Sequence, residues 1–361
     1  MKAVIFAGGV GTRLWPVSRK KSPKQFEKII GDKSTLQTYI DLLLPDFPLE
    51  DIYIATGHEY VEMVRTQLNF IPKENVIGEP CRRDVGPAVA FWAGYLAKKF
   101  PNEPMIILWS DHLIRNKEKF LEILKSVDMA LSEDPNKIIY FGHKPRFASV
   151  NLGWIETGAV EKSFNNINLL EFKGFKYRPD KPVAEKYFSN PKYCWNLGSF
   201  ASTPQYLYSL FERFTPQIHR LTEKILEHID TPTFEENFAK YYTQMPEIHI
   251  DNAIAEQLDK EFAYVIVEDI GWSDIGAWEA LKEALESRSD DNVTKGKVLL
   301  QESTDTLIYN YEDKKLIVGI DMEDMLVVNT DDVMLVTKKS SVSKIKKLVE
   351  SFEGTDYEKL T

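Results

Sequence analysis

The sequence opens with a short apolar run that passes directly into a glycine-rich turn and a series of cations. Residues 4–6 are Val-Ile-Phe, which predicts a strand buried on both faces. Three glycines follow between residues 8 and 11, where backbone N–H groups can approach a ligand without a side chain in the way. Arg13 and Lys24 bracket the next segment, with three further cations at residues 19–21. This pattern indicates a phosphate-binding loop.

Two common phosphate-binding loops do not fit these residues. A Walker loop requires Lys and Ser or Thr directly after its last glycine, where this chain has Thr12 and Arg13. A dinucleotide-binding turn requires a further glycine at the position that Leu14 occupies. Judged on the glycines alone, a tight strand-to-helix turn with a solvated basic run is the remaining alternative.

Composition limits the classes of function. The chain has 361 residues and a net charge of −10, which argues against a nucleic-acid partner or an anionic membrane surface. Its two cysteines, Cys81 and Cys194, provide neither a disulfide framework nor zinc-ligand spacing. The N-terminus resembles no signal peptide, and no apolar run is long enough to span a bilayer. We therefore expect a cytoplasmic protein without a membrane partner.

Strands alternate with helices through the first part of the chain, which predicts right-handed βαβ units and a mostly parallel sheet. Ser34 and Gln37 have the spacing of a capping box, which starts the first helix. Pro87 is expected to open another helix. Ligands of such sheets gather at the carboxyl ends of the strands. The expected strands are residues 52–56, 75–79, 104–110 and 137–142, with a helix at 117–132.

The pattern changes after residue 147. An antiparallel insertion is expected first, then a strand that returns to the sheet and a mostly helical stretch at 204–242. The polar run at 289–292 predicts a boundary between a catalytic domain at 1–288 and a small C-terminal β domain at 289–361 that ends in a helix. Further expected strands are 153–160, 169–177, 195–201 and 262–268, with helices at 181–189 and 278–287.

Two aspartates follow predicted strands and are candidate metal ligands. Asp111 and Asp274 each stand where a strand meets solvent, and carboxylates there suit a hard divalent cation beside phosphates. Each could equally be a helix N-cap. The six histidines show no metal-ligand spacing, and no Gly-x-Ser-x-Gly elbow occurs, so hydrolase and redox interpretations have little support.

Residues 8–26 read G-G-x-G-T-R-L-W-P-x-S-R-x-x-x-P-K-Q-F, which resembles the signature of the mannose-1-phosphate guanylyltransferases among the sugar nucleotidyltransferases. The resemblance implies an α/β, Rossmann-like three-layer nucleotidyltransferase domain with a mixed, mostly parallel sheet, and a C-terminal short left-handed β-helix. It implies transfer of GMP from GTP to mannose 1-phosphate, with Mg²⁺ as cofactor. Arg13 and Lys24 would be catalytic, and Asp111 and Asp274 would bind the metal.

The resemblance extends to segments that would bind the nucleotide and the sugar. Among the positions that depart from the family pattern, Asp84 replaces an Asn in E-P-x-x-R-N-T-A-P-A, and Tyr177 replaces the Glu of F-x-E-K-P-D. Two alternatives therefore stay open, another sugar 1-phosphate or base on the same scaffold, and a non-catalytic sugar-nucleotide sensor. The small β domain could form a homodimer or cover the main domain. The implied nucleotide-binding residues are Ala7, Gly8, Gly9, Gly11, Thr12, Glu79, Arg83 and Pro87, and the implied sugar-binding residues are Gly153, Glu156, Arg178 and Asn196.

Overall fold

The computed structural model describes residues 1–9 and 11–361, which form two compact units. The first unit comprises Met1–Ala7, Asp41–Trp109 and Arg115–Ile270, and the second comprises Gly8–Ile40, Ser110–Ile114 and Gly271–Thr361. The second unit contains all of the predicted C-terminal domain and also the glycine turn and the basic loop. The division into domains at 1–288 and 289–361 stays a prediction.

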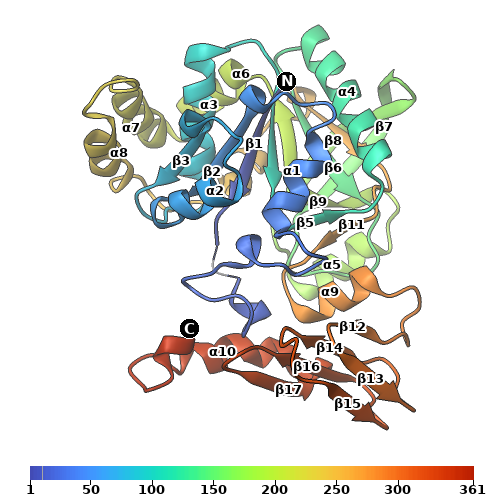
Figure 1. Ribbon diagram of the computed structural model, residues 1–361. Helices are drawn as coiled ribbons and strands as arrows, with labels where there is room; N and C mark the ends of the chain where they lie inside the picture. Colours follow the sequence, from blue (N-terminus) through green and yellow to red (C-terminus); the bar gives the residue numbers. More distant parts are fainter. Residues whose placement is uncertain (10) are drawn as a thin grey trace. The chain divides into compact units, whose positions relative to one another are not determined.

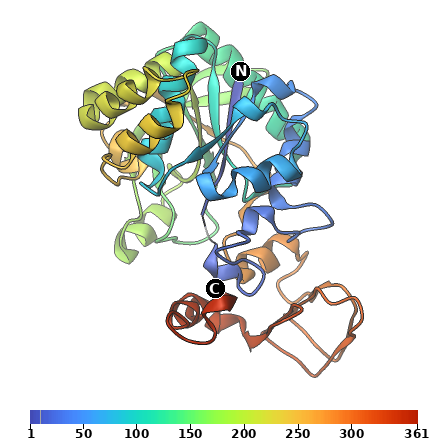
Figure 2. The same ribbon diagram turned by 60° about the vertical axis from the view of Figure 1, so that its left-hand side comes forward.

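A nine-stranded mixed sheet forms the middle of the first unit, with helices on both sides of it (Figures 1 and 2). Its order is β3-β2-β1-β4-β9-β6-β10-β8-β7. The first four strands are mutually parallel, whereas β9 runs antiparallel to both of its neighbours in this order, β4 and β6. The strands are β1 (Lys2–Ala7), β2 (Ile52–Gly57), β3 (Val76–Glu79), β4 (Met105–Trp109), β6 (Ile138–His143), β7 (Trp154–Phe164), β8 (Ile167–Lys176), β9 (Tyr193–Ser202) and β10 (Ala263–Val267).

The predicted mixed, mostly parallel α/β fold is confirmed. Every residue of β1 is buried, as the apolar run predicted for a central strand. The antiparallel pair β7 and β8 does not stand apart as an insertion. It extends the main sheet, because β8 pairs with β10 and β7 also pairs with β9.

The helices of the first unit pack against this sheet or against one another. Helix α3 is buried over most of its length, and its Phe91 stacks on Phe238 of α8 with ring centroids 4.6 Å apart. α3 begins two residues before Pro87, because Asp84 caps it by accepting a hydrogen bond from the Val85 N–H. The helices are α2 (Val61–Gln67), α3 (Val85–Lys99), α4 (Lys117–Glu133), α5 (Lys181–Phe188), α6 (Pro204–Phe214), α7 (Pro216–Leu226) and α8 (Phe234–Tyr242).

The second unit ends in a stack of short strands, coloured orange to red in Figure 1. The chain alternates between two sheets, with β12, β14 and β16 parallel in one and β13 and β15 parallel in the other, which is the arrangement of a short β-helix. Asn329 donates a hydrogen bond to Asn310 on the neighbouring coil. The strands are β12 (Val293–Lys295), β13 (Val298–Gln301), β14 (Leu307–Asn310), β15 (Ile317–Ile320), β16 (Met325–Asn329) and β17 (Met334–Lys338).

The basic loop and the β-helix share one apolar core in this unit. Leu14 and Trp15 of the loop pack in the same cluster as Trp278 of α9 (Trp278–Leu285) and Val349 of α10 (Ile345–Glu350). The predicted capping box is present before α1 (Thr35–Leu43), where Ser34 and Gln37 exchange hydrogen bonds between side chain and backbone. A two-stranded ribbon of β5 (His112–Ile114) and β11 (Trp272–Asp274) completes the unit.

Candidate active site

The glycine turn follows β1 and has an open surface. A Cβ atom on Gly8 or Gly9 would meet no other atom within 4 Å, and Gly9 has a φ of 101° that favours glycine. Gly11 has a φ of 61°, and a Cβ atom there would lie 2.8 Å from Cγ of Lys24. Position 11 therefore requires glycine for both its backbone conformation and its packing against Lys24. Val10 lies outside the described residues.

Lys24 is held against Asp111. It begins a short 3-10 helix after Pro23, is only 8% exposed, and places its Nζ 2.5 Å from Oδ2 of Asp111. Burial is the largest influence on Asp111 and raises its pKa, but the Lys24 and His112 charges and the hydrogen bonds to the carboxylate together outweigh burial and lower the pKa to about 2. Asp111 is therefore an ionised carboxylate at neutral pH, with a cation already beside it.

Asp274 joins the same cluster through the β5–β11 ribbon, in which it is paired with His112. Burial lowers the pKa of His112, and the carboxylates of Asp111 and Asp274 both oppose that shift, so the imidazole lies near both acids. The two acids are not helix N-caps. Asp111 leads into β5, and α9 begins after Ala277 without a side-chain cap.

Arg13 completes the cluster. A Cβ atom on Gly276 would lie 2.9 Å from Nη2 of Arg13 and 3.0 Å from Oδ1 of Asp274, so both side chains lie against the same backbone position. Arg13 itself is exposed. The second unit thus brings together four residues that the sequence singled out at separate places, two cations and two carboxylates.

The remaining cations of the basic loop have other roles. Arg19 donates two hydrogen bonds to the carboxylate of Asp332, at 2.7 and 2.5 Å, and another to the Pro16 carbonyl. Trp15 donates its indole N–H to the carbonyl of Leu360. Arg19, a cation within the predicted phosphate-binding loop, therefore links that loop to Asp332.

Three of the predicted nucleotide-binding residues, Glu79, Arg83 and Pro87, lie in the first unit. The Tyr242 hydroxyl donates a 2.6 Å hydrogen bond to Glu79 at the end of β3. Burial raises the pKa of Glu79 to about 7, and the Tyr242 hydrogen bond only partly opposes this. Arg83 donates to the Thr243 carbonyl, and Pro87 lies in the first turn of α3.

The predicted sugar-side residues also lie in the first unit, around the start of β7. The Asn196 N–H donates to the Gly153 carbonyl at 2.8 Å, and the Asn196 side chain accepts from the Gly198 N–H. The Tyr193 hydroxyl donates to Glu156 at 3.0 Å. Arg178 donates through Nε to the Asn151 carbonyl at 3.2 Å.

Sequence reasoning missed three residues beside this group, namely His249, Asp251 and Glu256 around a short π-helix. Tyr177 stacks on His249, and its N–H donates to Glu256 at 3.0 Å. The available signal was an acid, Asp251, which with Asn252 interrupts the apolar residues at 250 and 253–255. Asp251 is 6% exposed, and burial raises its pKa to about 7.

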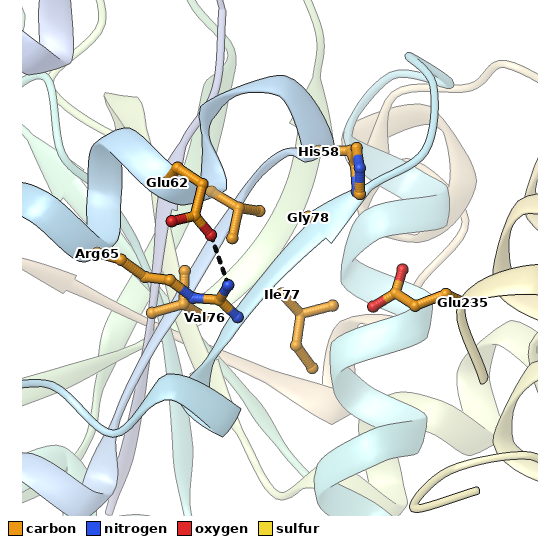
Figure 3. A pocket seen from close by; sticks show the side chains of 8 residues that line it. His58, Glu62, Arg65, Val76, Ile77, Gly78 and Glu235 are labelled. Carbon is orange, nitrogen blue, oxygen red and sulfur yellow. Dashed lines mark hydrogen bonds and ion pairs between the residues drawn. The ribbon is translucent and has the colours of Figure 1, made fainter. Parts of the chain in front are cut away.

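A hollow of about 160 Å³ at β3 contains none of the predicted site residues (Figure 3). Its cation, Arg65, is already paired with Glu62 at 2.7 Å. In the described part of the chain, no three His, Cys, Asp or Glu side chains form a metal-binding group, and no helix has the length and apolar character needed to cross a membrane.

Comparison with known proteins agrees with this architecture. The model of the nucleotidyl transferase family matches residues 2–290, and that of a MannoseP isomerase/GMP-like beta-helix domain matches residues 296–352. Mannose-1-phosphate guanylyltransferase 2 of Escherichia coli O157:H7 is 33% identical over 358 residues, which cover 96% of this chain and 72% of the relative. Mannose-1-phosphate guanylyltransferase of Escherichia coli K12 is 31% identical over 361 residues, which cover 97% of this chain and 73% of that relative.

A solved structure has the same fold. The crystal structure of mannose-1-phosphate geranyltransferase from Thermus thermophilus superimposes with a TM-score of 0.86 at 24% identity, covering 98% of this chain and 99% of that one. With the two family models and the curated relatives, the predicted family is confirmed. The chain is a transferase that belongs to the nucleotidyl transferase family, in the branch of the mannose-1-phosphate guanylyltransferases.

Proposed function

We propose that this enzyme transfers GMP from GTP to mannose 1-phosphate, with GDP-mannose and pyrophosphate as products. The observation that carries the proposal is the cluster of Arg13, Lys24, Asp111 and Asp274 in the second unit. It supplies opposite charges at fixed positions, as required to hold two anionic phosphates for an in-line reaction. The names of the curated relatives support the identity of both substrates.

The attacking group is a phosphate oxygen of the sugar 1-phosphate, which is already ionised at neutral pH. It therefore needs no general base. We assign Arg13 to the triphosphate, and Lys24 to the α-phosphate and the sugar phosphate. The lowered pKa of His112, caused mainly by burial, keeps its imidazole neutral beside them. The backbone N–H groups at residues 7–9, 11 and 12 are assigned to the nucleotide phosphates.

The donor set of the cluster fits Mg²⁺. This ion is commonly held by one or two carboxylates together with substrate phosphates, and Asp111 and Asp274 are two carboxylates beside one imidazole. Both would be its protein ligands. When bound, Mg²⁺ would neutralise charge on the phosphates and on the departing pyrophosphate.

In the first unit we assign the end of β3 and the start of α3 to the nucleotide, through Glu79, Arg83 and Pro87. The group around β7 is assigned to the sugar, through Gly153, Glu156, Arg178 and Asn196. The net charge of −10 disfavours a nucleic-acid partner. Action in the cytoplasm as a homodimer completes the proposal, and light scattering at several concentrations would test the dimer.

A substrate panel tests the reaction. Pyrophosphate release would be measured with four nucleoside triphosphates and a set of hexose 1-phosphates, each with and without Mg²⁺. We expect GTP with mannose 1-phosphate to give the highest kcat/KM, and turnover to require the metal. A higher kcat/KM for another pair would contradict the proposed substrates. GDP-mannose binding without any turnover would support a sensor instead.

The presence of Tyr177 favours a second candidate function, in which the same scaffold uses another sugar 1-phosphate as substrate. The Tyr177 ring stacks on His249 at 4.5 Å, at the place where a carboxylate would otherwise accept sugar hydroxyl hydrogen bonds. The same panel separates the two candidates.

A further inference from the structure

Tyr177 and His249 form a fixed aromatic pair in the first unit. Their ring centroids are 4.5 Å apart and their planes are only 18° from parallel. The Tyr177 N–H is held by Glu256 at 3.0 Å, and the same carboxylate accepts from Lys176 at 3.2 Å. Because both the backbone and the ring of Tyr177 have partners, the direction of this side chain is set by the fold.

The imidazole of His249 is also held by contacts with Asp251. Its Nδ1 accepts a hydrogen bond from the Asp251 N–H at 3.3 Å and lies 3.5 Å from the Asp251 carboxylate. Asp251 is buried, whereas the side chain of His249 keeps 24% of its surface exposed. The buried acid therefore orients the imidazole, and the Tyr177–His249 pair remains partly open to a ligand.

Asp84 lies beside this pair. The Gly86 N–H donates to the Ile248 carbonyl at 2.9 Å, and a Cβ atom on Gly86 would lie 2.6 Å from that oxygen, so the start of α3 contacts the residue preceding His249. The charge of Asp84 acts on both rings: burial raises the pKa of Tyr177 and lowers that of His249, and the Asp84 carboxylate pushes both upward.

One oxygen of the Asp84 carboxylate, Oδ2, can accept a hydrogen bond from a ligand. One oxygen, Oδ1, accepts the Val85 N–H at 2.7 Å, and Oδ2 has no hydrogen-bond partner among residues 1–9 and 11–361. Asp84 is exposed and has a φ of 61°, an unusual conformation for a residue with a side chain. Arg178, already assigned to the sugar, lies over the Tyr177 ring at 4.9 Å.

We propose that Asp84, Tyr177 and His249 form the part of the sugar subsite that selects the sugar, with Oδ2 of Asp84 accepting a hydrogen bond from one ring hydroxyl. Because His249 and Arg178 cover the Tyr177 ring, the partly exposed His249 imidazole contacts the apolar face of the sugar, and the Tyr177 hydroxyl donates to or accepts from a neighbouring sugar hydroxyl. In the family pattern, a Glu at the position of Tyr177 supplies the carboxylate. In this chain, Asp84 would supply it instead. This inference rests on the proposed function.

The principal test is Asp84→Asn. It keeps the size and one acceptor of the side chain but removes the charge, and we expect the KM for the sugar 1-phosphate to rise about tenfold. The KM for GTP should stay within about twofold. Asp230→Asn is the matched control, because Asp230 is another exposed aspartate and has a φ of 62°. It should leave both constants unchanged.

A rescue variant distinguishes recognition from a structural effect. In the Asp84→Asn background, Tyr177→Glu returns a carboxylate to the same subsite, and we expect most of the lost KM to be recovered. Tyr177→Glu alone should raise the KM, because two carboxylates then crowd one place. Simple additivity of the two changes would overturn the proposal, as would a rise in the KM for GTP rather than for the sugar.

Deoxy analogues identify the hydroxyl and separate this test from that of the reaction. For one deoxy sugar 1-phosphate, the native enzyme should lose about tenfold in kcat/KM, whereas Asp84→Asn should lose nothing further relative to its own value with the parent sugar. If another hexose 1-phosphate replaces mannose 1-phosphate as best substrate, the same comparison is made with that sugar. Equal losses for native enzyme and variant with every analogue would overturn the inference.

Discussion

Asp111 of the second unit and two acids of the first unit, Glu79 and Asp251, have opposite pKa shifts. In the second unit, burial raises the pKa of Asp111, but nearby charges, chiefly Lys24, and hydrogen bonds together outweigh burial and lower it to about 2. In the first unit, burial dominates and raises the pKa values of Glu79 and Asp251 to about 7. Asp111 therefore keeps its charge at neutral pH, whereas Glu79 and Asp251 partly lose theirs.

This difference matches the chemistry that we assign to each unit. Phosphates carry charge that must be balanced during transfer, so fixed and ionised partners are useful beside them. A base or a sugar hydroxyl is neutral and is recognised through directed hydrogen bonds and aromatic surfaces. The variants below test whether the residues around Asp111 act through their charge, and whether Asp251 is largely uncharged, in solution.

The largest effect is expected from removing a charge of the second unit. Lys24→Ala and Asp274→Ala should each lower kcat by a factor on the order of a hundred or more, because Lys24 is assigned to the reacting phosphates and Asp274 to the metal that would neutralise them. Steady-state pyrophosphate release measures this effect, and thermal unfolding checks that each variant is folded.

Lys21→Ala provides the matched control for Lys24→Ala. Lys21 belongs to the same basic loop, is exposed, and has no ion pair or hydrogen bond with the described residues. Its loss should leave kcat within about twofold, as expected for a solvated surface cation. Near-normal turnover in Lys24→Ala would remove Lys24 from the mechanism and weaken the contrast between the units.

A smaller effect is expected from Gly276→Ala. The new methyl group would lie 2.9 Å from Arg13 and 3.0 Å from Asp274, so both side chains must shift without any change of charge. We expect kcat to fall about tenfold, since displacement of positioned groups is costly. Gly174→Ala is the control, because its methyl group would meet nothing within 4 Å. An unchanged kcat would show that the spacing of Arg13 and Asp274 is not critical.

The sequence predicted many of the helices and strands well because their signals are local. The capping box of Ser34 and Gln37 lies within one helical turn, and both of its hydrogen bonds are present. The N-cap alternatives for Asp111 and Asp274 were wrong because a short β-ribbon, not a helix start, forms where two segments far apart in sequence pair with each other.

Contacts between residues far apart in the sequence could not be predicted from the sequence. Nothing near Tyr177 indicates that His249 will stack on it, since the two come together only through the folding of the chain between them. Arg19 likewise has the position of a phosphate ligand, and its pairing with Asp332 depends on a β-helix at the far end of the chain.

An intermediate effect on stability is expected from Asp251→Asn. Burial raises the folded-state pKa of Asp251 from 3.8 to about 7, so its contribution to stability is complete below pH 4 and is lost as the pH rises through 7. The uncharged variant lacks this loss. Its stability relative to the native enzyme should therefore increase between pH 5.5 and pH 8 by about 2 kcal/mol, measured by urea unfolding. A difference independent of pH would show that Asp251 is ionised throughout.

The smallest effect is expected at the ion pair between Arg19 and Asp332. The Arg19 and Asp332 side chains are 19% and 39% exposed, so Arg19→Ala and Asp332→Ala should each cost no more than about 1 kcal/mol of stability. The double variant should cost little more than either single variant, because both remove the same contact. Asp331→Ala, next in sequence, is the control. If Arg19→Ala instead lowered kcat a hundredfold while Asp332→Ala did not, Arg19 would belong with Arg13 and Lys24 at the phosphates rather than between the loop and the β-helix.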